Sequence, residues 1–159
     1  MSRLRKTALL AAVAASVAAP ASGALIAAKP VQYDTVSQGD GAASSLTGRA
    51  DYVIRTKREW RQMWAALNDG VIPKPARPRV DFRQSMLLLV TLGREPTGGY
   101  GITVTGVSKA TGRVAVDVEE RSPGSNCIVA QHVTAPYHVV SVPRGGVVRF
   151  RHHPTTSDC

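Results

Sequence analysis

The sequence predicts an α+β domain: an antiparallel sheet, or a small barrel-like sandwich, of about six strands with one Trp-bearing helix packed on it. Three observations favour this class. Residues 86–92 are a nearly continuous apolar run of strand length, typical of a strand covered on both faces. The segments after this run alternate apolar and polar residues between short turns, the pattern of antiparallel strands. One amphipathic helical pattern precedes it.

The N-terminal region predicts a signal peptide over residues 1–24. Arg3, Arg5 and Lys6 form a basic start, residues 7–19 are apolar and rich in Ala, and small residues suited to signal peptidase follow. We therefore expect an exported protein, periplasmic or extracellular, which meets a membrane only during export.

The rest of the chain divides into a tether and one domain. Residues 25–50 are rich in Ser, Gly and Ala and predict a tether, with an edge strand where residues 31–36 alternate weakly. Residues 51–159 form the domain. The sequence has two cysteines, Cys127 and Cys159, and no C-x-x-C motif, so in an exported chain they predict a disulfide that closes the domain.

The helix is predicted from its start signal and its apolar stripe. Thr56 is a good N-cap, and Glu59 three residues later completes a capping box. Gly70 is placed to end the helix. An apolar stripe at helical spacing predicts packing on the sheet rather than a partner-binding face. The stripe consists of Trp60, Met63, Trp64 and Leu67.

Two connections frame the buried strand. Residues 71–80 contain three prolines and predict an ordered crossing loop. Residues 93–99 are rich in glycine and predict a tight hairpin with a positive φ at Gly98 or Gly99. The further strands expected from alternation are residues 100–107, 114–119, 128–133, 137–142 and 148–151.

The charge of the chain indicates a basic surface. Lys and Arg number 20 against 11 Asp and Glu, a formal net charge of +9 at pH 7, which invites a nucleic-acid function. Export, the scatter of the basic residues and the few aromatic residues argue against nucleic acid, and favour a solvated basic surface. A binder of anionic envelope polymers remains an alternative.

No pattern of catalytic or metal-binding residues is evident. The histidines are not spaced as in a zinc site, and no cluster of carboxylates lies near them in the sequence. Glu119 and Glu120 are neighbours in a strand and point to opposite faces, which is poor geometry for a general acid/base pair. A disulfide would remove the thiolate of Cys127. We therefore expect no catalytic residues, no metal, no cofactor and no enzyme activity. An envelope hydrolase remains an alternative, which requires two or more histidines and a carboxylate in one cleft. The histidines are His132, His138, His152 and His153.

Four short motifs are distributed along the domain: Val80-Asp81-Phe82, Leu92-Gly93 at the end of the apolar strand, Pro96-Thr97-Gly98-Gly99-Tyr100 with Ile102, and Pro136-Tyr137-His138-Val139-Val140 with Val142-Pro143. These motifs resemble the PrcB C-terminal domain family, named for an accessory subunit of a bacterial surface protease complex. The helix residues Glu59, Trp60 and Trp64 are also similar to that family's helix. The resemblance implies an exported, non-catalytic module that assists or stabilises a protease complex.

The expected partner is therefore a protein, with a peptidase as the implied kind, and the oligomeric state is left open. A rigid glycine bend binds with little ordering cost, so we expect the contact there. The predicted partner-binding residues are Glu95, Pro96, Thr97, Gly98, Gly99 and Tyr100.

The same bend is similar to the Asn-Pro-Thr-Thr-Gly-Tyr loop of chagasin-type cysteine protease inhibitors. Glu95 stands in place of the Asn and Gly98 in place of the second Thr, and the inhibitors' later Arg-Pro-Trp loop has no counterpart. This resemblance implies protease inhibition as an alternative function.

Overall fold

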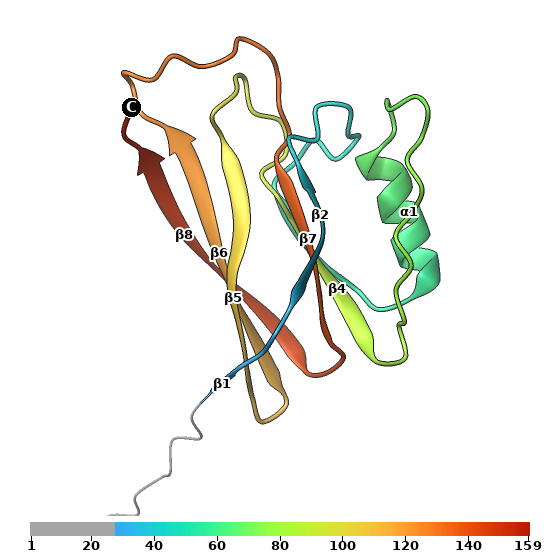
Figure 1. Ribbon diagram of the computed structural model, residues 1–159. Coiled ribbons are helices and arrows are strands. Elements are labelled where there is room, and N and C mark those ends of the chain that lie inside the picture. The colour runs from blue at the N-terminus through green and yellow to red at the C-terminus, as the bar shows by residue number, and fades with distance from the viewer. Residues whose placement is uncertain (1–27) are drawn as a thin grey trace, which may run out of the picture.

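The computed structural model describes residues 28–159, which form two four-stranded sheets and one helix (Figure 1). The predicted signal peptide lies outside the described residues. The first sheet has the order β1 (Lys29–Pro30), β5 (Gly101–Ala110), β6 (Arg113–Pro123), β8 (Val147–Ser157). The second has the order β2 (Asp34–Gly39), β7 (Tyr137–Pro143), β4 (Ser85–Thr91), β3 (Ala50–Ile54), and α1 is Lys57–Leu67.

The broad α+β class is therefore correct, but three details differ from the prediction. The described chain has eight strands rather than about six, and they form two sheets that do not close into a barrel. Residues 128–133 form no strand, because they cross from one sheet to the other with Ile128 fully exposed. The third difference is that β8 pairs with β6 in parallel, whereas the other strand pairs are antiparallel.

The parallel pair follows from the turn after β7. This turn carries the chain to the other sheet, where Val147 N–H donates to Gly112 O, so β8 starts at the end where β6 also starts. Gly146 has φ +49°, and a Cβ there would lie 2.8 Å from Gly112 O. A side chain at Gly146 would therefore push the two strand starts apart.

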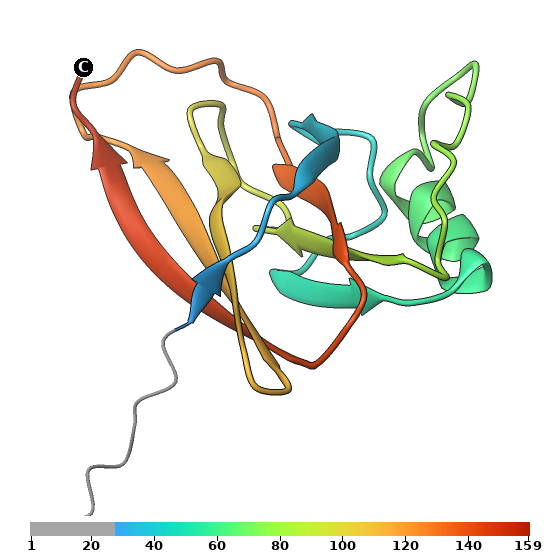
Figure 2. The same cartoon turned by 60° about the horizontal axis from the view of Figure 1, so that its bottom comes forward.

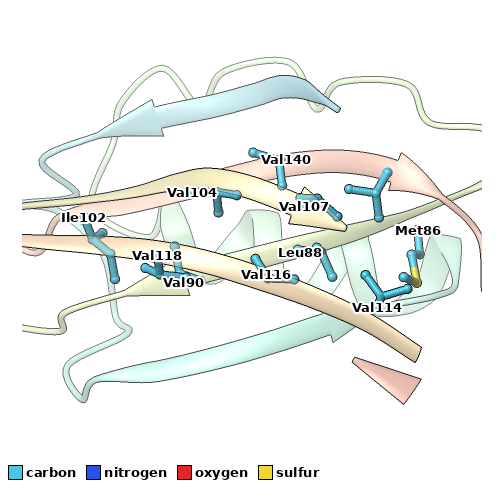
Figure 3. Packing of buried hydrophobic residues seen from close by; sticks show 11 residues of the cluster. Met86, Leu88, Val90, Ile102, Val104, Val107, Val114, Val116, Val118 and Val140 are labelled. Carbon is cyan, nitrogen blue, oxygen red and sulfur yellow. The ribbon is translucent and has the colours of Figure 1, made fainter. Parts of the chain in front are cut away.

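The central strand β4 is buried on both faces, as its apolar run predicted. Met86, Leu88 and Val90 point into the space between the sheets, where they meet a layer of valines from β5 and β6 (Figure 3). Leu87 and Leu89 point the other way, into a second cluster beneath α1. The molecule thus has three layers: the first sheet, the second sheet and the helix (Figure 1).

The helix begins and packs as its sequence predicted. The capping box between Thr56 and Glu59 is formed, and Trp60 and Leu67 are buried against the second sheet. The Trp60 indole N–H donates to Pro78 O at 3.0 Å, and the Trp64 indole N–H donates to Pro75 O at 3.1 Å. These bonds hold the proline-rich crossing loop against α1. Within residues 28–159, no helix has the length and apolar character needed to cross a membrane.

Residues 29–39, expected to be tether with an edge strand, contribute a strand to each sheet. β1 pairs with β5 and β2 pairs with β7, so the chain passes from one sheet to the other along one side of the sandwich (Figure 2). Tyr33 lies between these strands, and its hydroxyl donates to Val104 O at 3.1 Å. The edge strand expected at residues 31–36 is therefore present in part, as β2, and strand pairing extends into residues that were expected to belong to the tether.

Replacing Leu88 by Ala tests the central role of β4. Leu88 is fully buried between the sheets, so the cavity left behind is expected to lower the free energy of unfolding by about 2–5 kcal/mol. Urea unfolding measures the loss. Val147→Ala is the control, because that side chain is 61% exposed and is expected to change stability by less than about 0.5 kcal/mol. Equal effects of the two substitutions would contradict this assignment of the core.

Candidate functional site

The predicted partner-binding residues 95–100, called the contact loop below, join β4 of the second sheet to β5 of the first (Figure 1). The prediction of a hairpin is therefore wrong, because the flanking strands belong to different sheets. The predicted positive φ is present at Gly99, where φ is +87°. A Cβ at Gly99 would lie 2.9 Å from Val129 Cγ1, so both the backbone and the space require glycine.

The contact loop is fixed by the segment that crosses back between the sheets. Glu95 and Thr134 exchange two backbone hydrogen bonds of 2.8 and 3.0 Å, and Gly98 N–H donates to Ala130 O at 2.8 Å. The Thr134 hydroxyl also donates to Thr97 O at 2.9 Å. The loop is thus ordered by its neighbour instead of protruding alone.

The members of the contact loop differ in exposure. Pro96 and Gly99 are exposed, Gly98 is buried, and the other three are half-buried. Burial raises the pKa of Glu95, although the nearby Arg49 cation lowers it. The loop therefore offers a surface of small and apolar groups, with one carboxyl group set partly inside it.

Two exposed apolar side chains flank this loop. The Val133 side chain is 50% exposed and lies next to Thr134, which pairs with Glu95. The Ile128 side chain is fully exposed and lies next to Val129, which packs against Gly99. These two side chains add exposed apolar groups on the segment that holds the loop. Sequence reasoning missed them because it assigned residues 128–133 to a half-buried strand.

A polar cavity of about 320 Å³ opens beside the end of the contact loop. Tyr100 lines it together with Gln38 and Tyr137 of the second sheet and Arg121 of the first. A cavity of this size at the low end of ligand pockets accommodates a single side chain. Tyr100 therefore belongs both to the loop and to the wall of this cavity.

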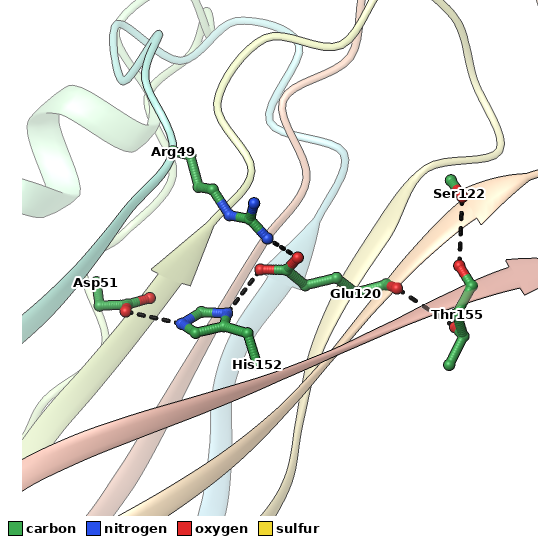
Figure 4. A network of polar contacts seen from close by, with 6 residues as sticks. All are labelled: Arg49, Asp51, Glu120, Ser122, His152 and Thr155. Atoms are coloured by element: carbon green, nitrogen blue, oxygen red, sulfur yellow. Dashed lines mark hydrogen bonds and ion pairs between the residues drawn. The ribbon is translucent and has the colours of Figure 1, made fainter.

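A polar network bridges the other side of the sandwich, where the edge strands β3 and β8 are not paired with each other (Figure 4). His152 of β8 places Nδ1 2.6 Å from a Glu120 oxygen and Nε2 2.9 Å from an Asp51 oxygen. Arg49 forms an ion pair with the other Glu120 oxygen. Arg55 donates to the carbonyl oxygens of Gly145 and Gly146 further along this side.

The geometry of His152 limits its chemistry. Each of its two ring nitrogens lies within hydrogen-bond distance of a carboxylate oxygen, one from Glu120 and one from Asp51. His152 therefore serves as a bridge between these two side chains. The sequence carried a signal for this network, because Glu120 follows the buried Val114, Val116 and Val118 in the same alternation and is 8% exposed.

His138 makes a second bridge, between β7 and β5. Its Nδ1 accepts the Val104 N–H at 2.9 Å, which leaves Nε2 to donate to the Thr35 hydroxyl at 2.9 Å. Burial lowers the pKa of His138 and favours this neutral form. The resemblance motif containing His138 therefore marks an inter-sheet contact.

The remaining candidates are dispersed. Cys127 forms the predicted disulfide with Cys159. His153 faces Asp117, whose pKa is lowered chiefly by a hydrogen bond from Arg151. Among residues 28–159, no group of three or more His, Cys, Asp or Glu side chains is arranged to hold a metal ion.

Comparison with known proteins gives one match. The model of the family described as PrcB C-terminal matches residues 86–143, from β4 to the end of β7. The resemblance to that family stated from the sequence is therefore confirmed over this segment, which includes the contact loop, Glu120 and His138. No curated protein and no solved structure matches the chain significantly.

Glu120→Gln tests the bridging network. The substitution removes the carboxylate that both Arg49 and His152 contact, so we expect the free energy of unfolding to fall by about 1–3 kcal/mol. The loss is smaller than for a fully buried ion pair, because the Arg49 side chain is 56% exposed. Urea unfolding measures the change. Glu119→Gln, an exposed position on the same strand, is the matched control. If the network did not stabilise the fold, both variants would have the same free energy of unfolding.

His138→Gln tests the buried bridge through its pH dependence. The pKa of folded His138 lies below its ordinary value of 6.5, so the unfolded state takes up a proton first as the pH falls. His138 thus contributes stability above pH 6.5 that is lost as the pH falls below this value, with a slope of at most about 1.4 kcal/mol per pH unit.

We expect His138→Gln to remove this part of the slope when unfolding is followed from about pH 7.5 to 5. The exposed His132→Gln variant is expected to keep it. Parallel stability curves for His138→Gln and the unchanged protein would show that His138 does not bind protons differently on folding.

Proposed function

Since residues 86–143 match the PrcB C-terminal family, we propose that this chain is an exported, non-catalytic module that binds a protease complex and assists or stabilises it. The observation that carries the proposal is the contact loop. It lies at the surface inside the matched segment, and its backbone hydrogen bonds with Ala130 and Thr134 order it in advance.

An ordered loop is suited to recognition. Binding then costs little additional conformational entropy, so each contact adds more to affinity. The flanking Ile128 and Val133 supply apolar area, and the cavity lined by Tyr100 gives a partner side chain a place to enter. These features support a protein as the partner.

The side chains most suited to chemistry are already engaged in structural contacts. Both ring nitrogens of His152 and of His138 have partners, and Cys127 is oxidised. A base or nucleophile needs a free lone pair next to a substrate site. This arrangement supports binding rather than bond cleavage as the role of the module.

Capture from the native envelope tests the proposal. The purified protein is immobilised, and the retained chains are identified by mass spectrometry. We expect a peptidase to be retained, and Thr97→Arg to reduce its retention at least tenfold, because the large charged side chain disrupts close contact at the loop. Activity of the captured peptidase with and without this protein then separates assistance or stabilisation from chagasin-like inhibition.

The matched control is Thr111→Arg, which adds the same charge at the exposed turn between β5 and β6. It is expected to retain the peptidase fully. Unfolding of each variant in urea shows whether the fold is intact. Equal retention by both variants, or peptide hydrolysis by the purified protein alone, would overturn the proposal.

A further inference from the structure

A second surface lies where the start of α1 meets the proline-rich crossing loop. A cavity of about 290 Å³ opens there, and none of its lining residues belongs to the contact loop or to residues 128–134, which hold that loop. Its walls combine apolar and basic groups. The lining residues include Lys57, Trp60, Arg77, Pro78, Arg79 and Phe82.

The floor of this cavity, called the basic cavity below, is apolar and rigid. Trp60 is 1% exposed and Phe82 is 7% exposed, and both belong to the core cluster beneath α1. Pro78 forms part of the wall and accepts the Trp60 indole N–H. Because proline fixes its own φ, the crossing loop holds this wall in place before any ligand arrives.

The rim carries uncompensated positive charge. Lys57, Arg77 and Arg79 line the cavity without any acidic residue, and within residues 28–159 none of the three forms an ion pair. The carboxylates nearest in sequence are used elsewhere. Glu59 accepts the N–H of Thr56 at the helix cap, and Asp81 accepts the N–H of Arg83.

From this combination we propose that the basic cavity binds an acidic segment of a protein partner, with one apolar side chain on the Trp60 floor and flanking carboxylates on the rim. The volume lies at the low end of the range for ligand pockets and accommodates one side chain of a bound segment. Charge complementarity selects carboxylates, and arginine pairs with them in a bidentate manner. An anionic polymer such as polyphosphate satisfies the rim but has no apolar group for the floor.

The site goes beyond the proposed contact loop and is tested with defined peptides. The probes are acetyl-Glu-Leu-Glu-amide, acetyl-Gln-Leu-Gln-amide and acetyl-Glu-Gly-Glu-amide, with polyphosphate as the fourth ligand. Binding is followed by the NMR signal of the Trp60 indole N–H. We expect the first peptide to bind, and loss of either the charges or the leucine to weaken binding at least tenfold.

The double variant Arg77→Ala/Arg79→Ala is expected to weaken binding of the first peptide at least tenfold. Its matched control is Arg58→Ala/Arg61→Ala, which removes the same charge from exposed positions on α1 that do not line the cavity. The control is expected to change the affinity less than about twofold, because these exposed charges are screened by solvent and do not line the cavity. Unchanged indole signals in the free variants show that the fold is retained.

Three results would overturn this inference. The first is that the Glu-Leu-Glu peptide does not bind at concentrations up to about 10 mM, which would mean an affinity too weak for a specific site. The others are an equal loss of peptide affinity in both double variants, and tighter binding of polyphosphate than of the peptide. The Thr97→Arg variant should bind the peptide normally. Failure of the contact-loop experiment therefore leaves this test intact, and the reverse also holds.

Discussion

The burial of β4 by two different partners is the constraint on which the rest of the structure depends. One face of this strand packs on the first sheet through Met86, Leu88 and Val90, and the other face packs beneath α1 through Leu87 and Leu89. Burial of each such side chain stabilises the fold by about 1.5–3 kcal/mol relative to exposure. Both edges of β4 are paired, one with β3 and one with β7, so the next strand in the sequence cannot pair with β4 as a hairpin and lies in the other sheet. The contact loop is that crossing, and its surface position is a consequence of the layering.

Two stacked sheets leave exposed strand edges, and this molecule covers the two sides of the sandwich differently. On one side the chain passes from β1 to β2, where the Tyr33 hydroxyl donates to Val104 O and His138 Nδ1 accepts the Val104 N–H. On the other side, side chains replace strand pairing: His152 joins Asp51 of β3 to Glu120 of β6. Unpaired strand edges can pair with another chain and aggregate, so the charged bridges there both join the two sheets and oppose such pairing. Both bridges depend on histidines that a search for catalysis singles out first.

The parts of the fold that the sequence predicted are those with local signals. A continuous apolar run identified β4, the Thr56 and Glu59 capping box identified the start of α1, and glycine chemistry predicted the positive φ at Gly99. The assignment of each strand to one of the two sheets and the parallel β8 were missed, because alternation shows that one face is buried but not which sheet buries it. The same limit applies to the site. The contact loop was recognisable as a motif, whereas the partners of His152 lie 32 and 101 positions away in sequence.

The contact loop and the basic cavity sit on opposite sides of β4 in the layer order. The loop joins the second sheet to the first, whereas the cavity belongs to the helix layer outside the second sheet. Each surface is small: one ordered bend with two aliphatic neighbours, and one cavity for a single side chain. A partner that reached both would bind the second as an intramolecular step, so two weak contacts would combine into a strong one through effective concentration. The rigid middle layer fixes the distance between them, and it therefore determines which partners gain from both.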